Sequence, residues 1–131
     1  MINREQFLQP REMAVKDVDI PGLGVVRISE LSKSQHCKFE LWLRPKGDFS
    51  ASRYAKRDQK LICLSVLDSD NQPMFDAEED MDAIGKQPGP MMDALAHEVK
   101  LLNGFITVVD DDKKVDDEED DVDELLGKSD S

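Results

Sequence analysis

This sequence has few of the residues from which disulfide frameworks, metal sites and catalytic centres are built. It contains two cysteines and two histidines, and aromatic residues make up only 5% of the chain. His36 is followed by Cys37, but neighbours on a helix point about 100° apart and do not form a dyad, and His97 lies beside no plausible nucleophile. Gly22 and Gly24 lie in a predicted turn rather than at the start of a helix, so they do not form a phosphate-binding loop. These absences argue against an enzyme, and no cofactor is expected.

Long apolar segments are also missing. No run approaches the roughly 18 apolar residues that a transmembrane helix needs, and residues 1–6 lack the apolar core of a signal peptide. Cys37 and Cys63 each fall in a segment with helical spacing, and two buried, reduced thiols are the simplest interpretation. Reduced thiols are typical of the cytoplasm, so the sequence predicts a cytoplasmic protein.

Basic residues are in deficit, and the net charge is −12. Residues 110–131 hold 12 acidic and 3 basic side chains, whereas the rest of the chain holds 17 acidic and 14 basic ones. This balance argues against nucleic-acid backbones and anionic membranes as partners, because both contacts need lysine and arginine. We therefore divide the chain into a nearly neutral body, residues 1–109, and an acidic tail, residues 110–131, with the composition of a disordered segment.

The acidic tail allows three interpretations. The simplest is a solubilising segment, and the second is an interaction tail that binds a basic partner. The third is an acidic mimic, resting on residues 110–124, that inhibits a nucleic-acid-binding protein. A mimic usually needs ordered carboxylates on a rigid scaffold, and a run this dense and polar does not fold alone.

A β-hairpin is the clearest element at the N-terminal end. Two β-branched runs, Val15–Ile20 and residues 25–28, flank a Pro-Gly turn and alternate apolar with polar side chains. Because a hairpin alone is marginal in water, its apolar face must pack on helices. Asn3 and Ser32, each followed three residues later by glutamine, are the predicted capping-box starts of two helices.

Residues 53–67 are predicted to form a central helix. Between residues 61 and 67 only Ser65 is polar, so this end belongs inside the domain. A buried strand is the rival interpretation of such a short apolar run. The Asx residues and Pro73 that follow end the element.

Two more helices are predicted over residues 77–84 and 91–102, and residues 105–109 have the β-branched content of a strand. The predicted fold class is α+β and mainly helical. The hairpin packs on a small bundle of about four helices, and a disordered acidic tail follows.

Asp68, Asp70 and Glu79 stand at the first, third and twelfth positions of a segment similar to the calcium loop of an EF-hand. The sixth position, which must be glycine for the sharp turn, is Pro73. Turn formation is therefore the simpler role for these carboxylates. A calcium-binding module stays open as an alternative function.

Four segments follow one another in a characteristic order: residues 18–31, 61–75, 80–85 and 101–104. Together they resemble the tail assembly chaperones of long-tailed bacteriophages with flexible tails. That family combines a short N-terminal helix and a hairpin with a helix that closes on an Asp-x-Asp-Gly-x-Pro-x-Phe segment, followed by two further helices. The present chain has Asn71-Gln72 where an Asn-Gly or Asp-Gly turn is usual in the family.

The resemblance implies a non-enzymatic protein made in the cytoplasm of an infected bacterial host and absent from the finished virion. Its expected partners are the tape-measure protein, which it would keep soluble, and the tail-tube protein, mainly through a longer, frameshifted product. Self-association is compatible with this role. The residues expected to bind a partner are apolar ones from the last helix and the strand-like segment after it: Met91, Met92, Leu95, Phe105, Ile106, Val108 and Val109.

A programmed frameshift would fit near the end of this sequence. Leu126, Gly127 and Lys128 can be encoded by a slippery heptamer of the form G-GGA-AAG. The acidic run would then be an extended linker to the domain that the shifted frame adds. The nucleotide sequence tests this prediction directly.

Overall fold

The predicted hairpin forms the first two strands of a three-stranded antiparallel sheet, in the order β1-β2-β3. Strand β1 (Val15–Ile20) pairs with β2 (Gly24–Ser29), with Val18 opposite Val26. Val18 and Ile20 are buried on one face, as the alternation predicted. The two residues of β3 (Val66–Leu67) pair with β2 at Ile28 and Arg27.

The computed structural model describes residues 1–106. Within them the α-helices are α1 (Arg4–Leu8), α2 (Lys33–Leu43), α3 (Ala51–Ala55), α4 (Arg57–Ser65), α5 (Met81–Gly85) and α6 (Gly89–Leu102), with a short 3₁₀ turn, η1 (Pro45–Gly47). The fold class is therefore α+β, as predicted. No helix in this part of the chain has the length and hydropathy to cross a membrane. The acidic tail, with Gly127 and Lys128, lies outside the described residues.

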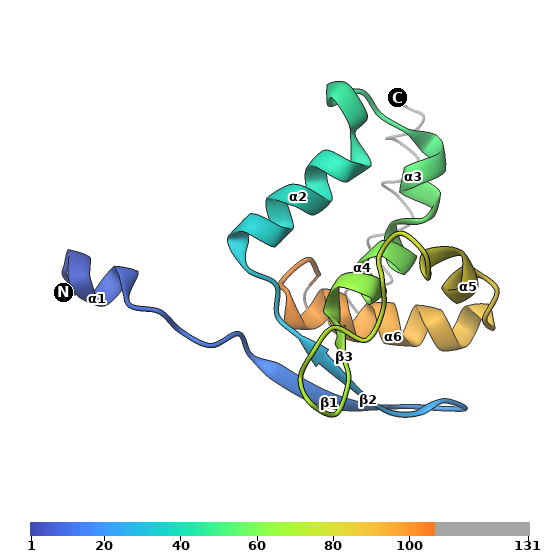
Figure 1. Cartoon of the computed structure of the whole chain (residues 1–131), viewed down its shortest axis with the longest axis horizontal. Helices are drawn as coiled ribbons and strands as arrows, with labels where there is room; N and C mark the ends of the chain where they lie inside the picture. The colour runs from blue at the N-terminus through green and yellow to red at the C-terminus, as the bar shows by residue number, and fades with distance from the viewer. Residues whose placement is uncertain (107–131) are drawn as a thin grey trace, which may run out of the picture.

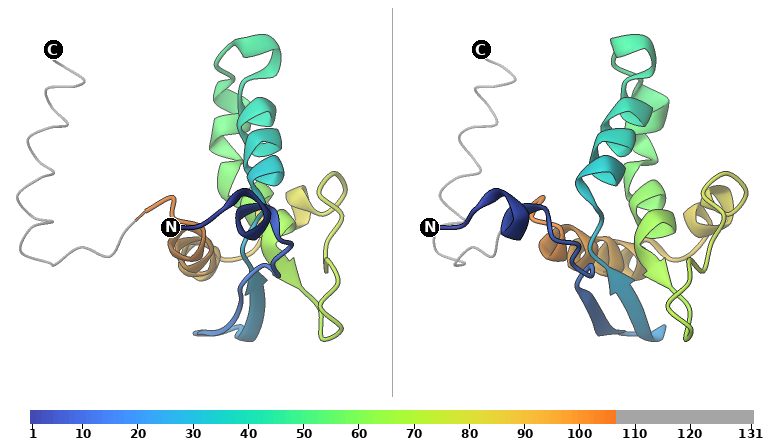
Figure 2. Two further views of the ribbon diagram at one scale, coloured as in Figure 1. Left: turned by 90° about the vertical axis from the view of Figure 1, so that its left-hand side faces the viewer. Right: turned by 60° about the vertical axis from the view of Figure 1, so that its left-hand side comes forward.

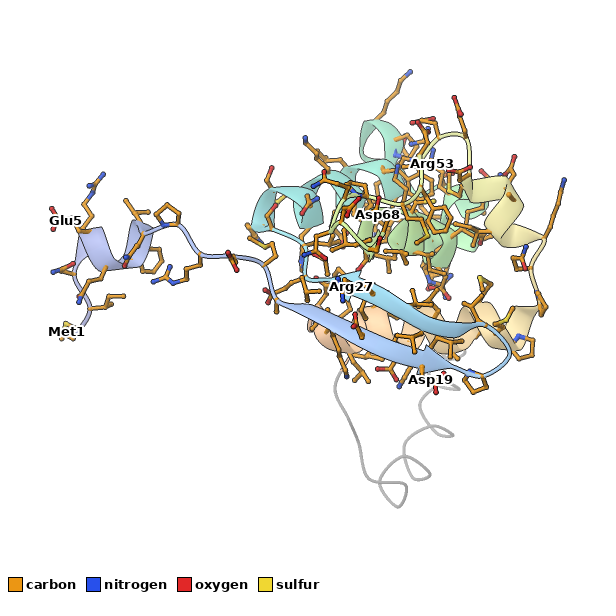
Figure 3. All side chains as sticks on the ribbon, turned by 60° about the horizontal axis from the view of Figure 1, so that its bottom comes forward. Met1, Glu5, Asp19, Arg27, Arg53 and Asp68 are labelled. Atoms are coloured by element: carbon orange, nitrogen blue, oxygen red, sulfur yellow. The ribbon has the colours of Figure 1, made fainter. Side chains whose placement is uncertain are left out.

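The helices form two groups around the sheet (Figure 1). Helix α6 packs against α4 and against β1 and β2. Helix α2 stands beside α3 and α4, and this column rises from the sheet with α6 across its base (Figure 2). Helix α1 lies apart from both groups, at the end of an extended segment that leads into β1 (Figures 1 and 3).

The centre of the fold is the junction between α4 and β3. Ile62 and Val66 are almost fully buried there, together with Ile28 of β2 and Val99 of α6. Ser65, also fully buried, joins α4 to the end of β2: its hydroxyl donates to the Ser29 carbonyl at 2.6 Å and accepts from the Ser29 N–H at 3.3 Å. A polar side chain is therefore accommodated in the core because both of its hydrogen-bonding roles are satisfied.

The prediction of one continuous helix over residues 53–67 is wrong. The chain breaks at Lys56, which has non-helical angles between α3 and α4. Val66 and Leu67 leave the helix and pair with β2. The rival strand interpretation is thus correct for these two residues, because β2 offers an unpaired edge just where α4 ends.

The helix predicted to start at residue 77 starts later, at Met81. The carboxylate of Asp76 accepts hydrogen bonds from the N–H groups of Glu78 and Glu79, at 2.8 and 2.9 Å, and holds these residues in a turn. These two bonds, from Glu79 first, also lower the pKa of Asp76. An Asx turn has therefore replaced the first turn of the predicted helix.

Other predictions of local structure have mixed outcomes. Both capping boxes, at Asn3 and Ser32, are confirmed. Cys63 is buried, but Cys37 lies on an exposed part of α2, so the prediction of two buried thiols is wrong for it. In the strand-like segment, Phe105 and Ile106 form a bend after α6. Its other residues lie outside the described part of the chain.

Candidate functional site: an apolar groove beside β2

An open, mostly apolar groove of about 620 Å³ lies between β2, the segment after β3, and helices α5 and α6. Buried Ile62, Ile84 and Leu95 form its floor. Val25 and Met74 line its sides and are 70% and 49% exposed. A groove with such exposed apolar walls is a candidate binding surface for another apolar chain.

The groove exists because β3 is short. Its two residues reach only Arg27 and Ile28 of β2, so residues 24–26 of β2 have no strand beside them on that side within the described structure. After β3 the chain turns and returns, with the Met74 N–H donating to the Val66 carbonyl at 3.1 Å. Met74 then lies opposite the unpaired part of β2 across an open space.

The turn that follows β3 is held in place by side chains. The Asp68 carboxylate accepts hydrogen bonds from the N–H groups of Asp70 and Gln72, at 2.8 and 3.0 Å. Asn71 takes a left-handed conformation, φ 63°, which asparagine tolerates better than most residues. Arg27 donates to the Asn71 side-chain oxygen at 3.0 Å and so ties the turn to β2. This wall of the groove is therefore preformed.

Arg27 is already neutralised by a neighbour on β1. Its guanidinium meets the Asp17 carboxylate in two parallel contacts, Nε to Oδ1 at 2.8 Å and Nη2 to Oδ2 at 3.1 Å. The hydrogen bond from Arg27 lowers the pKa of Asp17, and the same bond raises the pKa of Arg27. Figure 3 shows Arg27 on the sheet close to the segment that carries Asp68.

The rim of the groove is consequently acidic. Asp68 and Asp80 line it, and neither belongs to an ion pair within residues 1–106. Between residues 61 and 85 the sequence holds seven acidic side chains and no lysine or arginine. The groove therefore favours an apolar ligand with basic side chains at its edges.

The calcium alternative finds no ligand set in the described residues. Nowhere among them do three His, Cys, Asp or Glu side chains come close enough to hold a metal ion. The Asp68 carboxylate holds its own turn by accepting two backbone hydrogen bonds. The N–H of Glu79 donates to the Asp76 carboxylate. The carboxylates of this segment shape the chain, as the simpler interpretation predicted.

His36 and Cys63 have contacts that explain them without a catalytic role. His36 stacks on Phe105 at 4.8 Å between ring centres, and its Nε2 lies 3.5 Å from the Asn103 side-chain oxygen. That oxygen already accepts from the Leu31 N–H at 2.7 Å. Burial, with a smaller effect of nearby Asp80, raises the pKa of Cys63 to about 11. A thiol with this pKa is a poor nucleophile at neutral pH.

The predicted partner-binding residues fall in different places. Met92 and Leu95 line the groove. Met91 lies under the hairpin turn, with its sulfur 3.7 Å from the position that a Cβ on Gly22 would take. Phe105 packs on His36 and Phe39 beyond the other end of α6, next to half-buried Ile106. Val108 and Val109 lie outside the described residues.

Sequence reasoning missed most of the groove. In the alternating pattern of β2, Val25 does not fall on the apolar face. This was the one signal in the sequence that Val25 is available to a partner. Met74 and Phe75, which follow Pro73, come together here with β2, α6 and Ala83 from the helix predicted over residues 77–84. Comparison with protein-family models, with curated proteins and with solved structures finds no match to this chain.

Proposed function

We propose that this protein is a tail assembly chaperone of a bacteriophage, which binds the tape-measure protein and keeps it soluble until the tail tube forms. The observation that carries the proposal is the apolar groove of about 620 Å³ beside β2, which residues 1–106 leave open. A folded body that leaves such a groove open is suited to hold an apolar segment of another chain. A tape-measure protein is a long chain whose apolar stripe needs covering before assembly.

The lining of the groove suits a client with many similar binding segments. Met74 and Met92 are flexible, polarizable side chains that adapt to partners of somewhat different shape. Asp68 and Asp80 attract basic residues beside each apolar segment and disfavour acidic ones. The groove thus selects segments by chemical character, apolar with basic flanks, rather than by a single sequence.

The rest of the proposal follows from this role. The protein acts in the cytoplasm of the infected host without catalysing a reaction. A longer, frameshifted product helps to recruit tail-tube subunits, and the acidic segment links the two parts. All of the groove lies within residues 1–106, so client binding belongs to the body of the chain.

Co-expression with the tape-measure protein encoded by the same genome tests the proposal. The expected result is that the two proteins co-purify and that the soluble yield of the tape-measure protein rises. Replacing Val25 by lysine places a charge in the groove and should abolish both effects. Asp19 faces Val25 across the hairpin, so the fold should accept this lysine.

The matched control is Val15→Lys. Val15 is an exposed valine on the same face of the sheet, outside the groove, so this variant should behave as the wild type. A chain that ends after residue 109 should also keep full client binding. If the wild type neither co-purifies with nor solubilises the tape-measure protein, the proposed function is wrong. If only the shortened chain fails, the acidic tail and not the groove binds the client.

A further inference from the structure

Helix α1 and the residues just before it present exposed apolar side chains away from the rest of the described chain (Figures 1 and 3). Ile2, Phe7 and Leu8 are 54%, 66% and 58% exposed, and no residue of α1 is buried. Exposed apolar side chains grouped in this way are typical of a surface that binds a partner.

The helix is nevertheless well constructed. Asn3 and Gln6 form a complete capping box at its start, with bonds of 2.9 and 3.0 Å. At its end, the Arg11 guanidinium donates to the carbonyls of Gln6 and Phe7 at 2.8 and 3.0 Å. A helix this short is marginal in water without tertiary contacts. The hydrogen bonds at both ends hold the helix in shape, although it has no surface to pack on within residues 1–106.

One side of α1 carries the features that a partner would contact. Its apolar side chains line one small hollow together with Arg4: the lining is Ile2, Asn3, Arg4, Phe7 and Leu8. Arg4 is the only charged side chain among them. The contact side of α1 is therefore apolar and basic, which complements the apolar groove and its acidic rim, Asp68 and Asp80.

The arm points away from the groove of its own chain (Figure 1). Ala14 is fixed to Glu30 by two hydrogen bonds, both 2.8 Å, so the free part of the linker is residues 9–13. Five residues span at most about 18 Å. Leu23 and Val25 line the groove near the hairpin turn, whereas the arm leaves β1 at the opposite end. To place the helix between Leu23 and Val25 of its own chain, the linker would have to reverse its direction and run back along the roughly 20 Å length of β1.

We propose that α1 of one copy occupies the groove of a second copy of this protein. Phe7 and Leu8 pack between Met74 and Met92 of the second copy, and Arg4 lies near its acidic rim. The acidic tail, with 12 acidic and 3 basic residues, is a poor competitor for an acidic groove. Two copies that exchange arms satisfy both grooves in a closed dimer.

Arm exchange also covers the groove when no client is present. A client that enters the groove must displace the arm, so self-association and client binding exclude each other at each groove. This last step rests on the proposed function, whereas the association of two copies does not.

Sedimentation velocity of the full chain over a concentration series tests the arm exchange. The wild type should associate as concentration rises. Phe7→Asp in the arm and Val25→Lys in the groove should each weaken association at least tenfold, because each removes a buried apolar contact. Val15→Lys and Leu41→Lys, at exposed sites away from both surfaces, should associate like the wild type.

Mixing the two defective variants provides the decisive measurement. Phe7→Asp keeps an intact groove and Val25→Lys keeps an intact arm, so the mixture should form a complex that neither variant forms alone. A wild type that stays monomeric, an arm variant that associates normally, or a mixture that stays monomeric would overturn the proposal. Client binding is measured separately. Phe7→Asp should bind the client at least as well as the wild type, so a loss of self-association alone does not contradict the proposed function.

Discussion

The hydroxyl of Ser65 is a single buried group on which the joint between α4 and the sheet depends. It donates to the Ser29 carbonyl at 2.6 Å and accepts from the Ser29 N–H at 3.3 Å, and Ser65 itself has no exposed surface. Replacing Ser65 by alanine removes both hydrogen bonds at once and barely changes the size of the side chain. Both backbone groups of Ser29 then lose their partner.

The cost follows from the two bonds. A net contribution of about 1 kcal/mol for each gives about 2 kcal/mol of lost stability. The full penalty for two buried, unsatisfied groups would be larger, but Ser29 is only half-buried, so water can reach part of its backbone. For a folded body of this size, a loss of about 2 kcal/mol lowers the melting temperature by roughly 8 °C.

Urea unfolding followed by circular dichroism measures this effect. Ser34→Ala is the matched control, because Ser34 is exposed on α2 and its side chain makes no hydrogen bond within residues 1–106; it should change stability by less than about 0.5 kcal/mol. A Ser65→Ala variant as stable as this control would refute the reasoning that the hydroxyl joins α4 to β2.

Three other perturbations test separate parts of the fold. Native protein should show one thiol that reacts rapidly with a disulfide reagent, Cys37, because burial holds the pKa of Cys63 at about 11; two rapid thiols, or one in Cys37→Ser, would contradict this. The hydrogen bond from Arg27 lowers the pKa of Asp17 in the folded state. The pair therefore stabilises the fold at pH values above about 3.9, the pKa of Asp in the unfolded chain, and this stabilisation is lost as the pH falls through the lower pKa of the folded state. Asp17→Asn should therefore be less stable than the wild type at pH 7, and the difference should shrink as the pH is lowered into the acid range, as urea midpoints measured over a pH series will show. Ile62→Ala should lose about 3–4 kcal/mol, because Ile62 is 1% exposed in the core; a loss below about 1 kcal/mol in calorimetry would mean that the core collapses around the site.

Features fixed by neighbouring residues could be predicted from the sequence. The capping boxes at Asn3 and Ser32 each need only a glutamine three residues later, and both form. The hairpin depends on a Pro-Gly turn between two alternating runs, and its register follows from that turn. In each case the signal and the structure it specifies lie within one short segment.

Features that depend on distant segments could not be predicted. Val66 and Leu67 have the same apolar character as the helix before them, and only the edge of β2 makes them a strand. Apolar content placed Cys37 in the core, but α2 turns that position outward. The groove needs β2, the turn after β3, α5 and α6 together, so no single motif indicates it. Of the predicted contact residues that the structure describes, only Met92 and Leu95 line it.

The pairing of β2 with two very different neighbours has a consequence for the speed of folding. Its contact with β1 closes through a short turn, whereas Ile28 meets Val66 only after α2, α3 and α4 have been traversed. Local contacts form quickly, but closing the long loop costs chain entropy before any distant contact forms. Since a hairpin alone is marginal, we expect the docking of the α4–β3 junction onto β2 to limit the folding rate. Substitutions at this junction should slow folding, and those in α1 should leave the rate unchanged.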